Sequence, residues 1–297
     1  MKLPSTVQPI RVFVCFVVLC LSFQLPQSGA AEVERTWRTM TWTIDGVDRE
    51  ALVSFPKRQE EKKLAPLTFV FHGHGGTAKR MTGLGFGELW PQSIIVCPQG
   101  LPTVTGRDPK GERSGWQTRQ QPNEKSHSEN RDLLFFDEML ASMLANQAAD
   151  PNHVFVTGHS NGGGFTYFLF AHRSDKLCAI APSAAGAGAL RDARNAQPLP
   201  VMHIAGKADT VVKFANQERT VQMIRRHWGC REESTEYRAS KKLRGQQFHP
   251  EDKSKAGFIV FVVHAGGHRY HEETPEAVTA FFKSVVNGEN ESGNEGG

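Results

Sequence analysis

The stretch VFVTGHSNGGGF, residues 154–165, places one serine among four glycines directly after a short apolar run. Glycine inside a regular element costs roughly 0.5–1 kcal/mol relative to alanine, so such a cluster needs a structural reason. Gly-x-Ser-x-Gly between a strand and a helix is the context of a nucleophile elbow, in which the chain turns so sharply that side chains would collide. We therefore predict that Gly158 and Gly162 relieve this crowding around Ser160. The alternative is an ordinary glycine-rich helix start.

The apolar pattern on both sides of this stretch predicts an α/β fold. Unbroken apolar runs, typical of strands covered on both faces, occupy residues 67–71, 94–97, 154–157, 179–183, 201–206 and 258–263. Helical apolar spacing is found in residues 131–148, 161–172, 216–228 and 275–286. Alternating strands and helices predict a mostly parallel central sheet with helices on both faces. Residues 36–55, with Asp45-Gly46 at the centre, predict an antiparallel hairpin before it.

A serine nucleophile needs a base that takes its proton and an acid that orients the base. In an elbow architecture these follow the serine in the order acid, then histidine, at the ends of later strands. Asp209 lies three residues beyond the run 201–206, and His268 follows the run 258–263. Sites of open α/β sheets gather at the carboxyl ends of the strands. We predict a catalytic triad of Ser160, Asp209 and His268.

Each partner has rivals. His264 lies closer to its strand than His268, and His271 lies three residues beyond it, but the glycines before His268 leave room for a turn into the site. Asp175 follows the elbow helix and Asp192 lies in a small-residue stretch, so both fit the acid poorly. His159 neighbours the serine, so we expect a packing or loop role for it.

An oxyanion needs hydrogen-bond donors, and two backbone groups are candidates. One is the N–H of Asn161, directly after the serine. The other lies in the turn HGHGG, residues 72–76, where we favour His74 over Gly75. His72 and His74 could instead bind a metal, but no third ligand converges on them in the sequence. We predict neither a metal nor a cofactor.

The N-terminus is typical of an export signal. Lys2 and Arg11 precede the apolar run 12–20, and small residues at 28–31 offer a cleavage site. Removing residues 1–30 would lower the formal charge from +4 to +2, and no basic run alternates with aromatic residues, which disfavours nucleic-acid binding. We predict a secreted or periplasmic protein that is off the membrane after cleavage; an uncleaved anchor is the alternative.

The remaining chain predicts one catalytic domain over residues 31–286. Residues 102–130 are polar and rich in glycine and proline, so we expect a long surface loop, and residues 287–297 are expected to be a disordered tail. Cleavage would leave Cys97, Cys178 and Cys230, which allow at most one bridge, with three possible pairings.

The motifs HGHGG, CPQG, GHSNGG, APSAAG, GKADTVV and GGH, in this order, resemble the secreted α/β-hydrolase esterases. The resemblance covers roughly residues 37–285 and is strongest to the polyhydroxybutyrate depolymerase and feruloyl or acetyl-xylan esterase-like group. It implies an α/β-hydrolase fold and a serine carboxylic-ester hydrolase that forms an acyl-enzyme without a cofactor. It also assigns Ser160, Asp209 and His268 to the triad and His74 and Asn161 to the oxyanion hole.

Two positions bear on the substrate. Many members of the group have tryptophan two residues beyond the catalytic histidine, where this chain has Tyr270 followed by His271. Trp116 is a second aromatic candidate for the substrate pocket, or else a loop anchor on the core. The expected substrates are acylated sugars, hydroxycinnamate esters or short polyester oligomers. A serine peptidase of the same fold and a non-catalytic binding module are the competing functions.

Overall fold

The computed structural model describes residues 36–56, 64–119, 130–145, 149–191, 196–254 and 257–288. These described residues belong to one compact unit. The predicted signal peptide and the end of the predicted tail, from residue 289 onward, lie outside the described residues, so these assignments and the domain boundaries stay predictions. Within the described ranges, no helix has both the length and the apolar character that crossing a membrane requires.

A ten-stranded sheet forms the centre of the described structure, in the order β1-β2-β4-β3-β7-β8-β9-β12-β11-β10. The strands are β1 (Arg38–Ile44), β2 (Val47–Ser54), β3 (Ala65–Phe71), β4 (Ile94–Pro98), β7 (Ala149–His159), β8 (Ala179–Ser183), β9 (Val201–Gly206), β10 (Thr235–Arg238), β11 (Arg244–Phe248) and β12 (Ile259–His264). A small separate pair joins β5 (Leu101–Pro102) to β6 (Ser114–Gly115). Strands β4 to β12 in the middle of the order are parallel, and the strand pairs at each end are antiparallel.

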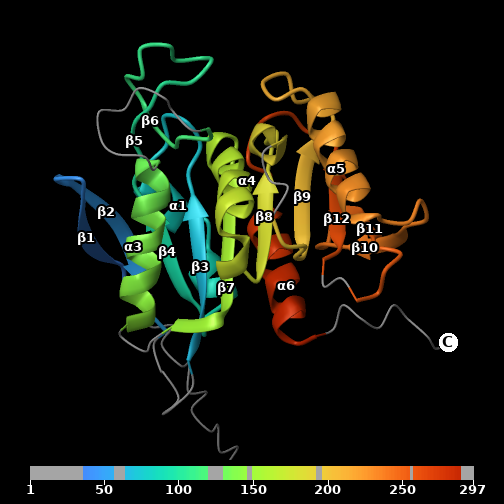
Figure 1. The fold of residues 1–297 in the computed structure, drawn as a ribbon, viewed down its shortest axis with the longest axis horizontal. Coiled ribbons are helices and arrows are strands. Elements are labelled where there is room, and N and C mark those ends of the chain that lie inside the picture. Colours follow the sequence, from blue (N-terminus) through green and yellow to red (C-terminus); the bar gives the residue numbers. More distant parts are fainter. Residues whose placement is uncertain are drawn as a thin grey trace, which may run out of the picture. The chain divides into compact units, whose positions relative to one another are not determined.

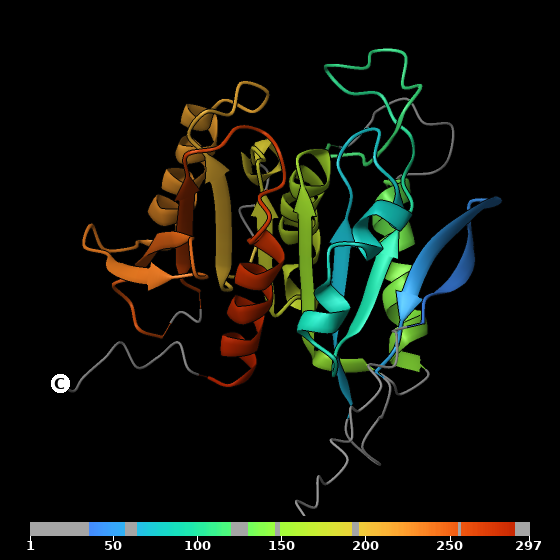
Figure 2. The same ribbon diagram turned by 180° about the vertical axis from the view of Figure 1, so that it is seen from behind.

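Helices cover both faces of the sheet, as the apolar strands require. They are α1 (Ala78–Thr82), α2 (Phe86–Leu89), α3 (Arg131–Ala145), α4 (Asn161–Arg173), α5 (Phe214–Trp228) and α6 (Thr274–Val286), with short 3₁₀ turns η1 (Ser174–Lys176) and η2 (Gly188–Arg191). Helices α3, α4 and α5 lie on one face (Figure 1), and α1, α2 and α6 lie on the other (Figure 2). Each face therefore has its own apolar core. On the first face the ring centroids of Phe69 and Phe136 are 5.0 Å apart, and on the second those of Phe155 and Phe282 are 4.7 Å apart.

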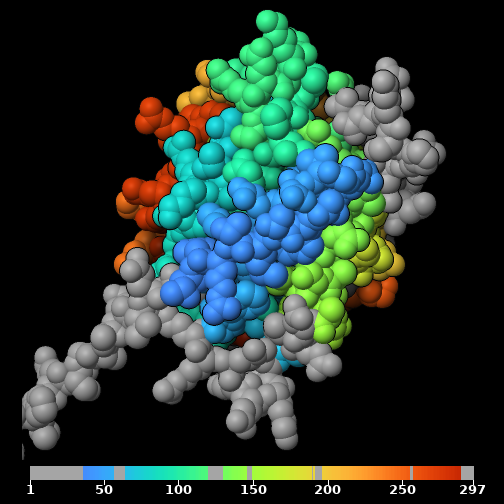
Figure 3. Space-filling model, turned by 90° about the vertical axis from the view of Figure 1, so that its left-hand side faces the viewer, coloured from blue at the N-terminus to red at the C-terminus, as the bar shows by residue number. Residues whose placement is uncertain are grey.

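The predicted N-terminal hairpin is present and lies across one edge of the sheet (Figure 3). Its turn residues Asp45 and Gly46 have φ values of 49° and 77°. Positive φ at both central positions is the backbone of a type I′ turn, whose twist suits two paired strands. Thr43 and Asp48 close the turn with a 2.7 Å hydrogen bond. The Asp-Gly pair is thus the local reason for the hairpin.

The predicted α/β class is confirmed, and two stretches differ from expectation. Strands β10 and β11, polar and partly exposed, extend the sheet beyond β12; their sequence lacks the apolar runs used to find strands. The predicted surface loop 102–130 is only partly such a loop. Its described part includes β6 and the buried residues Trp116 and Gln117, and the Trp116 ring stacks on Phe165 of α4. Residues 120–129 lie outside the described structure.

Candidate active site

The turn from β7 into α4 has the strained geometry expected of an elbow. Ser160 adopts φ 56° and ψ −114°, a conformation that costs a non-glycine residue about 1–3 kcal/mol. A Cβ on Gly158 would lie 2.5 Å from the carbonyl carbon of Gly162. A Cβ on Gly162 would collide with the carbonyl oxygens of Phe71 and His72. These two positions are glycine because the backbones of β3, β7 and α4 meet there.

The structure brings Ser160, His268 and Asp209 into one hydrogen-bonded line. His268 Nε2 lies 2.8 Å from Ser160 Oγ, and His268 Nδ1 lies 2.9 Å from Asp209 Oδ2. Asp209 is buried, and its Oδ1 accepts the N–H groups of Val211 and Val212 at 2.8 and 2.9 Å. With its carboxylate as acceptor, Nδ1 of His268 carries the proton and Nε2 is free to accept the serine hydroxyl.

The sheet order explains why Ser160 lies beside the turn HGHGG. The chain places β4 on one side of β3 and β7 on the other, so the strand order reverses between β3 and β7. Open α/β sheets form their sites outside the carboxyl ends of the strands at such a point. Ser160 follows β7, and the turn HGHGG follows β3, at this same place.

The loops after β9 and β12 hold each other, which sets the acid beside the base. The N–H of Lys207 donates to the carbonyl of His264 at 2.8 Å, and that of Ala208 donates to Gly266 at 3.1 Å. A Cβ on Gly206 would lie 2.6 Å from the carbonyl oxygen of Gly267, the residue before His268. The close approach of the two loops therefore depends on glycine at the end of β9.

The rival bases lie near the site but outside the hydrogen-bonded line. His264 Nδ1 accepts the N–H of Gly266, and its ring lies 4.8 Å from that of His271. The ring of His159 lies 5.1 Å from that of His268, and burial lowers the pKa of His159 to about 4, with the neighbouring histidine adding to the effect. His159 is therefore a neutral wall of the site at ordinary pH.

The rival acid Asp175 is not at this edge of the sheet. Asp175 belongs to η1, beyond the C-terminal end of α4, whereas Ser160 is at the N-terminal end of that helix. Asp192 lies outside the described residues.

The two expected oxyanion donors border the serine. The N–H of Asn161 is the first of α4, and no hydrogen bond within the described residues uses it or the N–H of His74. A Cβ on Gly73 would lie 3.5 Å from the Cβ of Ser160, so the HGHGG turn passes beside the nucleophile. The positive end of α4 also favours negative charge there.

Hydrogen bonds from β6 and the loop before it hold the HGHGG turn in place. Gly75 N–H donates to the carbonyl of Ser114 at 2.7 Å, and the Ser114 hydroxyl donates to the carbonyl of Gly76 at 2.7 Å. His74 Nε2 lies 3.1 Å from Asp108 Oδ2, in the loop between β5 and β6. Sequence reasoning missed Asp108 and Ser114, because each bonds to a residue of the HGHGG turn that is distant in the sequence.

The structure places the two expected substrate-binding aromatics differently. Trp116 is 1% exposed, packs between Phe71 and Phe165, and donates its indole N–H to the carbonyl of His72 at 2.9 Å. Its side chain is therefore a core anchor, not a surface contact for substrate. Tyr270 is partly buried, with its ring centroid 5.3 Å from that of His159, so it lies close to the line of Ser160, His268 and Asp209.

The rings of both histidines in HGHGG make hydrogen bonds within the protein. His72 Nε2 accepts the N–H of Gly100 at 3.0 Å, so its Nδ1 carries the proton and donates to the carbonyl of Gly73 at 2.8 Å. Burial lowers the pKa of His72, which keeps this ring neutral. Among the described residues, no three His, Cys, Asp or Glu side chains are grouped as metal ligands would be. No disulfide joins Cys97, Cys178 and Cys230.

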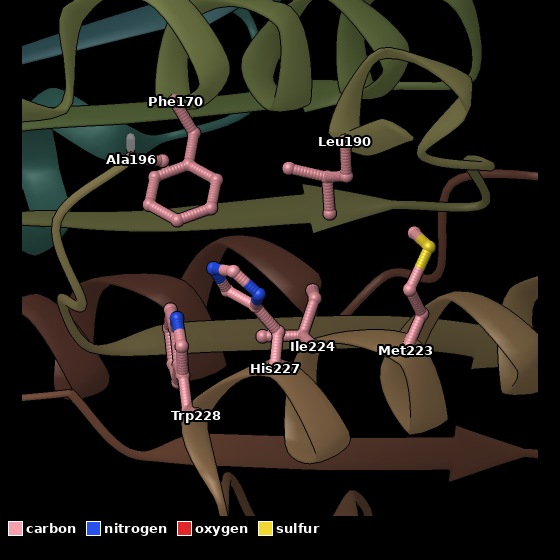
Figure 4. A pocket seen from close by; sticks show the side chains of 7 residues that line it. All are labelled: Phe170, Leu190, Ala196, Met223, Ile224, His227 and Trp228. Atoms are coloured by element: carbon pink, nitrogen blue, oxygen red, sulfur yellow. The ribbon is translucent and has the colours of Figure 1, made fainter. Parts of the chain in front are cut away.

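An apolar pocket lies elsewhere, between the C-terminal halves of α4 and α5 (Figure 4). It is lined by Phe170, Leu190, Ala196, Met223, Ile224, His227 and Trp228. The triad meets at the opposite end of α4, so this pocket is separate from the candidate active site.

Comparison with known proteins finds that the chain is similar to esterases. No family model matches it. It is 25% identical over 258 residues to feruloyl esterase D of Neurospora crassa, covering 84% of each protein. It is 22% identical over 256 residues to a probable feruloyl esterase C of Aspergillus terreus, covering 84% of this chain and 86% of that protein.

Solved structures share the fold. An acetyl xylan esterase from Aspergillus awamori superposes with a TM-score of 0.64 at 14% identity, covering 83% of this chain and 99% of that one. A ferulic acid esterase from Anaeromyces mucronatus, in complex with ferulic acid, has a TM-score of 0.55 at 15% identity and covers 86% and 94% of the two chains. The predicted resemblance to feruloyl esterases and the prediction of a carboxylic ester hydrolase are confirmed.

Proposed function

We propose that this feruloyl esterase-like α/β-hydrolase cleaves carboxylic esters through Ser160 as nucleophile, His268 as base and then acid, and Asp209 as the orienting acid. The observation that carries the proposal is the pair of hydrogen bonds that link His268 to Ser160 at 2.8 Å and to Asp209 at 2.9 Å. Such a constellation activates a serine hydroxyl that would otherwise be a weak nucleophile.

In the acylation half, Ser160 Oγ attacks the ester carbonyl carbon while its proton passes to His268 Nε2. The carbonyl oxygen becomes an oxyanion, for which the N–H groups of His74 and Asn161 are the donors; each such donor contributes about 3–4 kcal/mol in measured cases. The imidazolium, stabilised by Asp209, then protonates the leaving alcohol as the C–O bond breaks. The product of this half is an acyl-enzyme on Ser160.

In the deacylation half, a water molecule replaces the alcohol. His268 Nε2 takes one proton from the water, and the resulting hydroxide attacks the acyl carbon to form a second oxyanion at the same donors. Collapse of this intermediate releases the carboxylic acid and returns the proton from His268 to Ser160 Oγ. The cycle consumes one water per ester and needs no further reactant.

The substrate class we propose is the hydroxycinnamoyl or acetyl ester of a sugar. It is supported by relatives named feruloyl esterase and by structural neighbours named acetyl xylan esterase and ferulic acid esterase. Short polyester oligomers form a second arm of the test.

We also propose that the protein is exported. The basic residues, apolar run and small residues of positions 1–31 support this. Expression with and without residues 1–30, followed by cell fractionation and the mass of the exported protein, tests it. Retention of the full-length chain in the cell would contradict export.

A panel of esters tests the activity. It contains p-nitrophenyl acetate and longer p-nitrophenyl esters, methyl ferulate, acetylated xylan, polyhydroxybutyrate and peptide anilides, with Ser160→Ala as the control protein. We expect turnover of methyl ferulate or acetylated xylan that is lost in Ser160→Ala. Turnover of anilides alone would identify a peptidase, and no turnover of any substrate would favour a binding module.

A further inference from the structure

The triad acid has a second layer of hydrogen bonds behind it. Gln217 Nε2 lies 3.0 Å from Asp209 Oδ2, the same oxygen that faces His268. Gln217 Oε1 lies 3.2 Å from His203 Nε2, and His203 Nδ1 lies 2.6 Å from the hydroxyl of Tyr167. The side chains of Gln217, His203 and Tyr167 are all completely buried. They come from α5, β9 and α4, so the line crosses three elements.

Only one set of proton positions satisfies this line. Gln217 Nε2 also lies 2.7 Å from the carbonyl oxygen of Val212, so the group between two acceptors must be the NH₂. Gln217 Oε1 then accepts from His203 Nε2–H. The remaining nitrogen of His203, Nδ1, has a lone pair, which leaves the Tyr167 hydroxyl as its donor. Each member fixes the direction of the next, from Tyr167 to Asp209.

We propose that Tyr167, His203 and Gln217 are positioning residues that hold the Asp209 carboxylate in the orientation His268 requires. The proposal rests on the proposed esterase function. Tyr167 lies on the same helix that begins at Ser160, so the line joins the helix of the nucleophile to the acid at the far end of the triad.

Loss of one member of this hydrogen-bonded line would change the surroundings of the Asp209 carboxylate. Without the Tyr167 hydroxyl, His203 Nδ1 is a buried acceptor with no donor, so this hydrogen bond no longer helps to hold the ring in the tautomer that donates Nε2–H to Gln217 Oε1. The other tautomer would turn a lone pair toward Gln217 Oε1 and press the amide to flip, which would set Oε1 against Asp209 Oδ2. Burial lowers the pKa of His203 to about 4, so the ring is neutral and its tautomer matters over the working pH range.

Buried polar groups also pair simply because an unpaired one is costly, so the test must separate positioning from stability. Tyr167→Phe and Gln217→Met remove one hydrogen-bonding group each and keep most of the packing. Thr68→Val is the matched control, because it also removes a buried hydroxyl. This hydroxyl lies 3.2 Å from Ser93 Oγ, and Ser93 precedes β4, on the other side of β3 from β7 and Ser160. Each variant is compared with wild type in urea unfolding and in p-nitrophenyl acetate kinetics from pH 5 to 9.

For Gln217→Met and Tyr167→Phe we expect kcat/KM to fall by about 10–100-fold with KM changed less than about twofold, since small misplacements of catalytic groups cost rate. We also expect the low-field proton NMR signal of the His268–Asp209 hydrogen bond, read on the resting protein, to shift or broaden in both. Thr68→Val should lose stability and keep both kcat/KM and that signal. Wild-type kinetics and an unmoved signal in Tyr167→Phe, or an equal loss of rate in Thr68→Val, would overturn the proposal. Absence of turnover in wild type, with the signal still responding to Gln217→Met, would instead count against the esterase function.

Discussion

The side chain of Asn161 holds the backbone of Trp116 at both ends. Its Oδ1 accepts the Trp116 N–H at 2.7 Å, and its Nδ2 donates to the Trp116 carbonyl at 2.9 Å. One residue thus offers its backbone N–H to the candidate oxyanion hole and uses its amide to tie the elbow helix to the segment that supports the HGHGG turn.

This clamp predicts a catalytic loss without loss of the oxyanion donor itself. Asn161→Ala keeps the backbone N–H of residue 161 but releases Trp116. We expect kcat/KM for p-nitrophenyl acetate to fall about 10–100-fold, because the HGHGG turn, which carries the N–H of His74, loses its support. Asn152→Ala, an exposed asparagine on β7, serves as the control and should keep wild-type kinetics. Wild-type activity in Asn161→Ala would show that the clamp has no part in the site.

The histidine assignment is tested by a matched pair of variants. His268→Ala should reduce kcat/KM by roughly 10⁴-fold or more, since it removes the group that takes the serine proton. His264→Ala, at the end of β12 and close to His271, should retain activity within about tenfold. The measurement is ester hydrolysis, with circular dichroism to establish folding. The reverse pattern would transfer the role of base to His264.

The crowding at the elbow predicts a large stability difference between two glycines of α4. Gly162→Ala would drive a methyl group into the carbonyl oxygens of Phe71 and His72, and the backbone there cannot move without disturbing β3. We expect a loss of several kcal/mol in the free energy of unfolding, of the order seen for overpacked cores, or failure to fold. Gly164→Ala meets only the Thr118 methyl group at 3.2 Å and should change that free energy by about 1 kcal/mol or less. Urea unfolding of both variants decides the matter, and equal effects would contradict the elbow geometry.

The buried histidines predict a loss of stability in acid. The folded-state pKa values of His159 and His203 are lowered to about 4, chiefly by burial. The unfolded chain binds a proton at each near pH 6.5, so these two groups favour folding fully above that pH, and their contribution disappears as the pH falls toward 4. Each adds up to about 1.4 kcal/mol per pH unit to the slope in this window.

Urea unfolding at several pH values between 4 and 7 measures that slope. His159→Gln should remove about the share of one histidine from the slope and leave the remainder. An identical slope in wild type and His159→Gln would mean that His159 is protonated in the folded protein as readily as in the unfolded chain.

Much of the sheet could be predicted because its strands are buried on both faces. Residues 67–71 and 179–183 are apolar except for Thr68 and Ser183, and this pattern needs no tertiary information. Strands β10 and β11 were not predicted, because exposed antiparallel strands can be mostly polar. The pairing of β11 with β12, and of β10 with β11, makes them strands.

The proximity of Ser160, Asp209 and His268 could be predicted for a similar local reason. Ser160, Asp209 and His268 each follow a recognisable strand, and parallel strands deliver their ends to one edge of the sheet. The role of Trp116 could not be settled in this way, because a tryptophan in a polar loop reads the same whether it faces the core or the solvent. The structure places it in the core, held by the clamp from Asn161.

The sequence by itself determined the elements whose cause is local: apolar runs, the Asp-Gly turn, the glycine spacing at the elbow and the order of serine, acid and histidine. Only the tertiary structure decided which polar side chains meet inside. Tyr167, His203 and Gln217 lie on three different elements, and nothing in their spacing sets them apart. Their hydrogen bonds exist because helix packing on the sheet brings them within 3.2 Å of one another, and that packing depends on every layer of the fold at once.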